Sequence, residues 1–407
     1  MELIEASKTP FPTRMLTPQF IAKLCTLPYP VAKIVLQYYT VGTIYSKTNI
    51  EFKHSLYNNV LVAMEAHMAM NLQKNDMKAV CYEPITKLLT RFKRKSPMVK
   101  HLNAFGEKFD DYSYWIHKSD GCTDLQKTNV VVYYHGGGYL LNMIESQLTF
   151  SAALHFALDD KTAANTSILI VDYSLTMFDH IYPTQLYECL CSYNNLVKSG
   201  YRNITLMGDS AGAHMSLSIA RAIAYPEEIK QQFDYFSQFK LDFSVADLPQ
   251  PKALILDSPW VQPCTQPKPS RHNVDTTGDI IGFDNNLGHY LVEDLDQKFI
   301  NNFLKFTNTN WEDHWQKVDP INNGNTIILV GEREVLRDGM EDFYNIVNKN
   351  GNVEYYVEPG GIHAGMVYIE SLDYMGKKGG KRAIRGDFKN KFGIDIVSQF
   401  LNSREFV

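Results

Sequence analysis

A serine stands between two glycines in the segment GDSAG at residues 208–212, a spacing that suits a nucleophile. The segment follows a short apolar run ending at Met207 and precedes an Ala-rich stretch with helical periodicity. A sharp turn from strand to helix exposes the hydroxyl of the central residue, and flanking glycines avoid steric clashes there. The pattern alone arises by chance in roughly one chain of this length in ten, and the alternative is an ordinary glycine-rich turn. In this context it predicts that Ser210 is a nucleophile, with Asp209 as a structural residue of the motif.

Three adjacent glycines follow a second apolar run, in the segment HGGGY at residues 135–139. Such glycines let backbone N–H groups turn into a cleft, where they can stabilise the oxyanion of an acyl-transfer intermediate. The alternatives are a flexible loop and a phosphate-binding turn. The segment lacks the spaced glycines of a dinucleotide loop and the Lys-Ser/Thr of a P-loop, which argues against a nucleotide cofactor. We expect His135 to be a structural hydrogen-bonding residue and not a catalytic base.

A nucleophilic serine in this kind of turn needs an acid and a base further along the chain, in the order Ser, Asp or Glu, His. Glu334 and Asp338 both follow the apolar run at residues 326–330, and His363 lies in a glycine-rich loop after the run at 353–357. All three therefore come after the carboxyl end of a predicted strand, where α/β sheets place their sites. We predict that His363 is the general base.

Two carboxylates compete for the role of the acid. Glu334 lies three residues after Gly331, where the chain is still leaving the strand. Asp338 stands at the start of a helix that we expect over residues 339–348, where it would cap the helix N-terminus and match the helix dipole. We therefore predict that Glu334 is the acid and that Asp338 is structural.

Short apolar runs alternate with longer helical patterns from about residue 128 onward. The helical patterns include residues 186–198 and 211–224. The runs are rich in Val, Ile and Tyr and are typical of buried strands; they cover residues 129–134, 167–173, 204–207, 253–256, 326–330 and 353–357. Strands that alternate with helices predict the α/β class, with a mostly parallel central sheet and helices on both faces.

Two regions depart from this alternation. Residues 1–105 are largely helical in pattern, and residues 262–318 form an insertion far longer than the usual connection between a helix and a strand. We predict an N-terminal helical cap region at 1–105 and a catalytic α/β domain at 106–407 that carries a cap insertion at about 262–318. A shorter insertion follows at residues 226–250.

The N-terminal region contains an apolar stretch at residues 34–45. It is shorter than the roughly 18 apolar residues of a membrane span, and the N-terminus lacks the charged, apolar and small-residue order of a signal peptide. We expect a buried cap helix there. The alternative is a helix that lies on a membrane surface.

Composition narrows the classes of partner. The chain has 407 residues and a net charge of −5, so no strong positive field attracts nucleic acid. Its six cysteines form no CxxC pair and no zinc-like spacing with histidine, so we expect no metal. The many aromatic residues fit either core packing or an apolar binding pocket. Basic clusters at 91–95 and 377–385 suggest solvated surface, with attraction to an anionic membrane as the alternative.

Taken together, the two glycine motifs resemble the hormone-sensitive-lipase branch of the α/β hydrolases. Further landmarks of that branch are the segments YSL at 173–175, YP at 182–183 and DSPW at 257–260. The resemblance covers roughly residues 105–400 and implies an α/β-hydrolase fold. Two positions depart from the family: Glu334 stands where Asp is usual, and Ser174 replaces the arginine after the tyrosine. Within the branch, chain size and the N-terminal extension look most like fungal steryl acetyl hydrolases.

By position, the resemblance implies that Ser210, His363 and Glu334 form a catalytic triad. It also implies that backbone N–H groups form the oxyanion hole, and we assign these to Gly136, Gly137, Gly138 and Ala211. No cofactor is implied. The expected reaction is hydrolysis of a lipophilic ester, with removal of acetyl groups from acetylated sterols at the endoplasmic reticulum as its most specific form.

Two other functions fit the same residues. One is a broad-specificity carboxylesterase or lipase. The other is a catalytically silent lipid-binding protein on the same scaffold, which the intact serine, acid, histidine and glycines disfavour. The resemblance favours the endoplasmic reticulum, membrane-associated or luminal, with the cytoplasm as the alternative because the sequence shows no clear anchor or signal peptide. Peripheral membrane association is an alternative that the sequence leaves open. The oligomeric state is left open.

Overall fold

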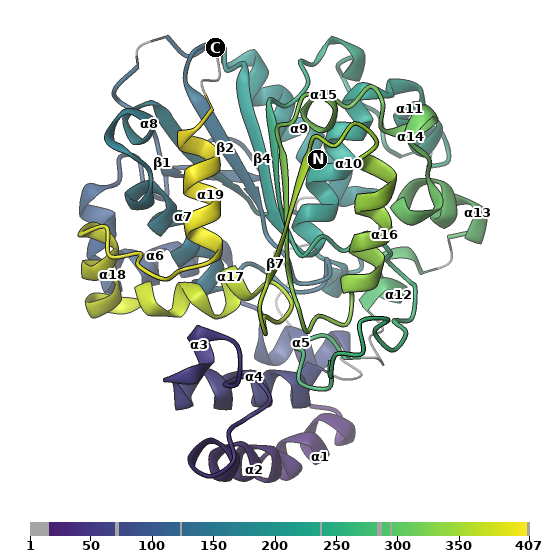
Figure 1. The fold of residues 1–407 in the computed structure, drawn as a ribbon. Helices are drawn as coiled ribbons and strands as arrows, with labels where there is room; N and C mark the ends of the chain where they lie inside the picture. The colour runs from purple at the N-terminus through teal and green to yellow at the C-terminus, as the bar shows by residue number, and fades with distance from the viewer. Residues whose placement is uncertain are drawn as a thin grey trace.

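A twisted seven-stranded sheet runs through the middle of the protein (Figure 1). The computed structural model describes residues 16–404 except 70–72, 123, 237, 283–286 and 294. The strand order is β1-β3-β2-β4-β5-β6-β7; β1 runs antiparallel to β3, and all the other neighbours are parallel. The strands are β1 (Ser113–His117), β2 (Asn129–Tyr134), β3 (Thr166–Val171), β4 (Asn203–Asp209), β5 (Ala253–Asp257), β6 (Thr326–Gly331) and β7 (Val353–Glu358). The predicted mostly parallel α/β architecture is confirmed.

The strands alternate side chains between two apolar cores, one on each face of the sheet. In β2, Val130 and Val132 belong to one core, whereas Val131 and Tyr133 belong to the other. Successive side chains of a strand point to opposite faces of the sheet. A strand that is buried on both faces therefore has a nearly continuous apolar sequence, which is why these runs were recognisable. The edge strand β1 was not predicted, because polar Ser113 and His117 flank its short apolar centre.

Helices cover both faces of the sheet. Figure 1 shows α9, α10 and α16 on one side and α7 and α19 on the other. The first core includes α9 (Thr184–Lys198), α10 (Ala211–Ala224) and α16 (Arg337–Val347). The second includes α6 (Ile85–Lys95), α7 (Glu145–Ala157), α17 (Gly365–Tyr368), α18 (Gly376–Ile384) and α19 (Gly393–Asn402). Other short helical segments of the chain are η2 (Pro97–His101), α8 (Asp160–Asn165), η3 (Thr176–Phe178) and η7 (Glu370–Tyr374).

Two insertions lengthen the connections between strands. The first follows α10 and contains α11 (Pro226–Asp234) and η4 (Val245–Asp247). The second joins β5 to β6 and contains α12 (Leu287–Val292), α13 (Gln297–Phe299), η5 (Ile300–Leu304), η6 (Phe306–Asn308), α14 (Trp311–His314) and α15 (Asp319–Asn322). The second insertion reaches the carboxyl ends of β6 and β7, as described below.

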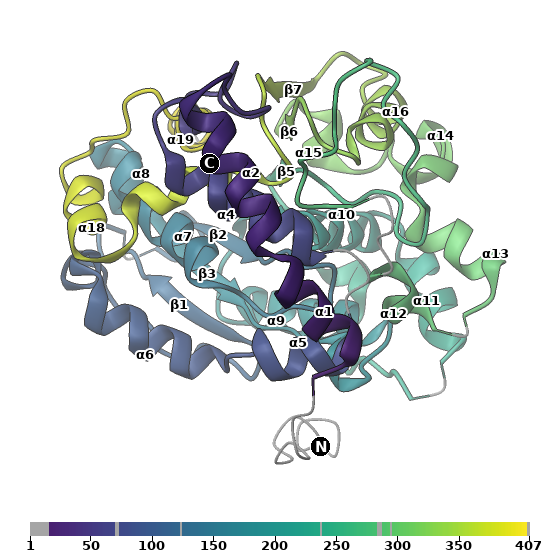
Figure 2. The same cartoon turned by 90° about the horizontal axis from the view of Figure 1, so that it is seen from below.

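The N-terminal helices lie beyond the carboxyl edge of the sheet. They are α1 (Pro18–Thr26), α2 (Pro28–Tyr39), α3 (Ile50–Lys53), α4 (Leu56–Ala69) and α5 (Lys74–Val80). Figure 1 shows α3 and α4 next to the α/β core and α1 and α2 outside them; Figure 2 shows α1 and α2 crossing in front of the sheet. A small third core, which includes Phe52, Val62, Ile280 and Ile362, joins these helices to the second insertion and to the loop after β7.

The prediction of a buried helix at residues 34–45 is wrong. The helix α2 ends at Tyr39, and Ile34 is its one buried residue. Leu36 and Tyr39 are 66% and 71% exposed, so an apolar face of α2 points outward. No helix in the described part of the chain is long and apolar enough to cross a membrane. The predicted lack of a signal peptide concerns residues 1–15, which lie outside the described residues.

Candidate active site

Ser210 occupies the turn between the end of β4 and the start of α10. Its φ of 52° and ψ of −114° lie outside the regions that ordinary residues prefer. A Cβ on Gly208 would collide with the backbone of Gly212, and one on Gly212 would collide with the carbonyl of Tyr134. The two glycines are therefore required by the close approach of β2, β4 and α10. The Ser210 N–H donates to the Asp257 carbonyl at 2.8 Å and the Ser210 carbonyl accepts from the Trp260 N–H at 3.1 Å, which stabilises the turn.

His363 and Glu334 form a buried pair beyond the ends of β7 and β6. His363 Nδ1 lies 3.0 Å from Glu334 Oε2, and each residue is 1% exposed. The other carboxylate oxygen, Oε1, accepts hydrogen bonds from the Gly331 N–H and from the Ser258 hydroxyl. Burial by itself would lower the pKa of His363, but the hydrogen bond and charge of Glu334, with smaller contributions from Asp279 and Asp209, raise that pKa above its usual value. Glu334 therefore orients the imidazole and stabilises its protonated form.

The second ring nitrogen of His363 is the one available for proton transfer. Nε2 is buried and has no hydrogen-bond partner among the residues that the structure describes. His363 and Ser210 line the same cavity. Because Nδ1 donates to Glu334, Nε2 is the free basic nitrogen that a triad requires.

Two of the three glycines in the loop after β2 line the cavity. The Gly136 N–H donates to Asp209 Oδ1 at 2.9 Å, so the prediction that Gly136 is an oxyanion donor is wrong. Gly137 and Gly138 line the cavity with φ values of 109° and 60°, which favour glycine. Ala211 begins α10, where the first N–H groups of a helix have no intrahelical acceptor. Gly137, Gly138 and Ala211 are therefore the candidate oxyanion donors.

Asp209 and His135 hold this loop in place. Besides the Gly136 N–H, the Asp209 carboxylate accepts hydrogen bonds from the Tyr133 hydroxyl and from Gln147 Nε2. The His135 ring stacks on Tyr173 with 4.3 Å between ring centroids, and burial lowers its pKa to about 4. His135 Nδ1 also hydrogen-bonds the Gly136 carbonyl at 2.7 Å, so His135 is a neutral structural residue that both packs and hydrogen-bonds, whereas Asp209 connects the glycine loop to the turn at Ser210.

Two residues that the sequence analysis did not select also fix the triad. Asp279, in the second insertion, accepts the His363 N–H at 2.9 Å and the Val335 N–H at 2.8 Å, and so connects the base loop to the acid loop. Burial raises the pKa of the Asp279 carboxyl to about 6. Ser258 donates to Glu334 and accepts from the Ala364 N–H at 2.8 Å. Ser258 belongs to the DSPW landmark, whereas no local pattern marks Asp279.

Asp338 does not cap its helix. The helix α16 begins at Arg337 after the N-cap residue Leu336, so Asp338 lies inside the first turn, and the predicted capping role is wrong. Its Oδ2 instead accepts the backbone N–H of Arg271 at 2.9 Å. Asp338 therefore connects the second insertion to α16.

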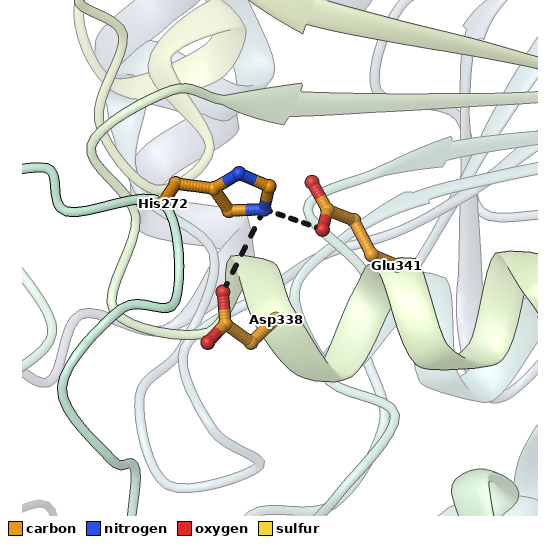
Figure 3. Close-up of side chains that lie close together, drawn as sticks. All are labelled: His272, Asp338 and Glu341. Carbon is orange, nitrogen blue, oxygen red and sulfur yellow. Dashed lines mark hydrogen bonds and ion pairs between the residues drawn. The ribbon is translucent and has the colours of Figure 1, made fainter.

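His272 completes a polar cluster at this point, shown in Figure 3. Its Nε2 lies 2.6 Å from Glu341 Oε2 and 3.9 Å from Asp338 Oδ1. The three side chains are close enough to share a metal ion. However, the Arg271 guanidinium already pairs with Glu341 at 2.9 Å and with Asp342 at 2.6 Å. We therefore describe this group as an ion-pair cluster.

Ser210 and His363 open into a cavity of about 460 Å³. Its size is typical of a pocket for a small organic molecule. Helices of the N-terminal region form much of its wall and contribute Phe20, Leu24, Met64, Met68, Met77 and Val80. The cavity is thus largely apolar; besides the groups around Ser210 and His363, its polar lining residues include Glu65 on α4, Asn142 and Tyr368.

Comparisons with known proteins identify the family of this chain. A family model described as steryl acetyl hydrolase matches residues 19–384. "Putative steryl acetyl hydrolase mug81" of Schizosaccharomyces pombe is 25% identical over 402 residues, covering 95% of this chain and 98% of its own. Steryl acetyl hydrolase 1 of Saccharomyces cerevisiae is 24% identical over 261 residues, covering 60% of this chain and 56% of its own.

A solved structure agrees at the level of the fold. The HSL-homolog EstE7 from a metagenome library has a TM-score of 0.51 at 15% identity. The match covers 86% of this chain and 98% of that chain.

Proposed function

This chain belongs to the steryl acetyl hydrolase family and is a carboxylic ester hydrolase, and from that premise we propose that it deacetylates lipophilic alcohols, sterols among them. We assign the catalytic roles to Ser210, His363 and Glu334. The observation that carries the proposal is the buried Glu334–His363 pair, which shares an apolar cavity with Ser210 and with the unused N–H groups of the glycine loop.

The proposed reaction proceeds in two steps. His363 Nε2 takes the proton of Ser210 as Oγ attacks the ester carbonyl, and the N–H groups of Gly137, Gly138 and Ala211 stabilise the oxyanion. The tetrahedral intermediate collapses, and His363 returns the proton to the departing alcohol. Water, deprotonated by His363, then attacks the acetyl-serine ester. The second tetrahedral intermediate collapses as His363 returns the proton to Ser210 Oγ, which releases acetic acid that ionises to acetate.

The character of the cavity supports a lipophilic alcohol. Leucine and methionine side chains from α1, α4 and α5 form a wall without charge, except at Glu65. Burial of apolar substrate surface against such a wall is favourable in proportion to its area. A sterol acetate combines a large apolar alcohol with a small acyl group that fits beside the oxyanion loop.

A substrate panel tests this proposal against its two alternatives. Initial rates of the purified full chain are compared on a sterol acetate, a long-chain ester of the same sterol, and p-nitrophenyl acetate. The sterol acetate should exceed the long-chain ester by about tenfold or more in kcat/KM. Ser210→Ala serves as the blank and should lose several powers of ten in kcat.

Each alternative has its own outcome. Equal rates on both sterol esters would identify a broad-specificity carboxylesterase or lipase. A folded wild-type chain that hydrolyses no ester and fails to react with a fluorophosphonate would instead be a silent lipid-binding protein.

The exposed apolar face of the outer helices supports peripheral membrane binding. This face consists of residues on or just after α1 and α2, namely Ile21, Leu24, Tyr29, Leu36, Tyr39 and Val41, each at least 42% exposed. Leu24 also lines the cavity, so a membrane against this face would lie beside the cavity entrance. The family resemblance makes the endoplasmic reticulum the proposed compartment.

Flotation with neutral phospholipid vesicles tests the membrane proposal. Leu36→Glu combined with Tyr39→Glu should abolish co-flotation and leave hydrolysis of p-nitrophenyl acetate unchanged, because neither residue lines the cavity. Unchanged co-flotation of the double variant would contradict binding through this face.

A further inference from the structure

Glu65 places a carboxyl group in the apolar wall of the cavity. It lies on α4 next to Met64. Met68, one turn further along the helix, also lines the cavity. Among the residues that the structure describes, the Glu65 carboxylate has no hydrogen bond and no ion pair; its Oε2 is inaccessible to solvent, so Oε1 is the oxygen that can face the cavity. Burial raises the pKa of Glu65 to about 7.

Other buried glutamates of this protein have their partners. Glu370 accepts the N–H groups of Gly393 and Ile394, each at 2.9 Å. Glu188 accepts from the backbone N–H and from the hydroxyl of Ser174, both at 2.6 Å. A buried polar group normally has such a partner, because its hydration is lost on folding. Glu65 therefore differs from these glutamates because it lacks a partner, and it lies in the wall of the cavity that holds Ser210.

The polar groups around Glu65 do not provide its carboxylate with a hydrogen bond. The Tyr45 hydroxyl donates to the Gly278 carbonyl at 2.8 Å. Tyr368 lines the same cavity, and after burial itself the charges of Asp209 and Glu65 are the largest causes that raise its pKa. Tyr368 therefore lies close enough to Asp209 and Glu65 for both charges to act on it. Glu65 is thus connected through Tyr368 to the end of the cavity near Ser210.

We propose that Glu65 accepts a hydrogen bond from a hydroxyl group on the alcohol portion of the substrate, remote from the ester that Ser210 attacks. The inference rests on the proposed function and narrows its substrate class to acetates of hydroxylated lipophilic alcohols. One hydroxyl needs one acceptor, which Glu65 supplies. An ammonium group has three donors and would need further acceptors beside Glu65, where the other lining residues of α4 are Met64 and Met68.

Paired substrates test this role. One is a sterol monoacetate with a second, free hydroxyl at the far end of the ring system; the other lacks that hydroxyl and is otherwise identical. A third substrate, the matched amine, replaces the hydroxyl with an amino group. Assayed at a pH above the raised pKa of Glu65, where its carboxylate is ionised, the wild-type full chain should favour the hydroxylated acetate over the plain one by about ten- to a hundred-fold in kcat/KM, as expected for a hydrogen bond to a charged group in an apolar site.

Three variants separate recognition from packing. Glu65→Leu should erase the preference by lowering kcat/KM on the hydroxylated acetate and not on the plain one. Glu65→Gln keeps an acceptor and should therefore retain part of the preference. Met64→Leu changes the same wall without removing a polar group, so it should affect both acetates equally. Each rate is divided by the rate of the same variant on p-nitrophenyl acetate, so that a general loss of activity cancels in the comparison.

The outcomes distinguish this inference from the proposed function. Hydrolysis of both acetates by the wild type with no preference, or an equal loss on both in Glu65→Leu, would overturn the role of Glu65 and leave the esterase intact. A stronger preference for the amine would overturn the choice of a hydroxyl. Absence of any hydrolysis by the wild type, p-nitrophenyl acetate included, would contradict the proposed function itself.

Discussion

The catalytic edge of the sheet and the N-terminal helices form opposite walls of one cavity, yet they are built differently. At the catalytic edge, Glu334, Ser258 and Asp279 each make at least two hydrogen bonds that fix the loops beyond β5, β6 and β7. On the N-terminal side, α4 presents mostly apolar side chains, and Glu65 has an unpaired oxygen. Polar contacts therefore fix the reacting groups, whereas the substrate-facing wall depends on apolar packing.

This difference has a consequence for mutations. A change at the catalytic edge breaks hydrogen bonds that position a reacting atom, so it should lower kcat on every substrate. A change on α1 or α4 removes a contact with one part of the substrate, so it should alter the ranking of substrates. The predictions below test the two halves of this contrast, from the largest effect to the smallest.

The largest effect is expected for Glu334→Gln. The amide would present a donor to the Nδ1–H of His363 and favour the wrong tautomer, so kcat should fall by roughly ten-thousand-fold on all substrates. The melting temperature should change little, since the amide oxygen can still accept from Ser258 or Gly331. Stopped or continuous ester assays with thermal unfolding measure both quantities. A Glu334→Gln protein with near-wild-type kcat would show that Glu334 is not the acid.

Gly137→Val should reduce kcat more than it changes KM. The residue has a φ of 109°, and a Cβ there would come within 2.9 Å of Leu141, so the loop must shift and move its N–H away from the oxyanion. Loss of one such donor costs about 3 kcal/mol of transition-state stabilisation, or roughly a hundred-fold in kcat. Gly351→Val is the matched control, because Gly351 also has a positive φ but lies in open space. A rise in KM alone would make the loop a substrate-contacting element.

The pH dependence of kcat/KM should reflect the charges of the carboxylates around His363. The free base is active, and its pKa is raised by Glu334 and Asp279, so kcat/KM should fall as the pH drops through a value above the usual pKa of histidine. Asp279→Asn removes one of these negative charges and should move the acid limb to lower pH. The profile is measured on p-nitrophenyl acetate from pH 5 to 9. An acid limb that stays in place would show that Asp279 acts only through its hydrogen bonds.

The sequence predicted the parts of the molecule whose signals are local. Runs such as β2 were recognisable because burial on both faces makes a strand continuously apolar, and Ser210, Glu334 and His363 were selected as candidates because each follows a strand end. The donor assignment at Gly136 failed because the acceptor, Asp209, comes from another strand. Asp279 and Glu65 were missed for the same kind of reason: tertiary packing brings a distant insertion and a distant helix to the cavity, and no local pattern records it.

The smallest effect is expected for Asp338→Asn, the other carboxylate beyond β6. Asp338 and Arg271 are 27% and 44% exposed at their side chains, so solvent screens their attraction. Arg271 would keep Glu341 and Asp342 as partners, and the asparagine oxygen can still accept the Arg271 N–H. The free energy of unfolding should therefore fall by less than about 1 kcal/mol, with kcat unchanged.

Arg271→Gln should cost more stability than Asp338→Asn, because Arg271 is the residue that all three carboxylates share. Urea unfolding at low and high salt measures both losses, which salt should reduce if they are electrostatic. An inactive but folded Asp338→Asn protein, beside an active Glu334→Gln protein, would transfer the role of the acid to Asp338. That result would place the catalytic carboxylate in the exposed ion-pair cluster, and the contrast between a buried catalytic edge and an adaptable apolar wall would no longer hold.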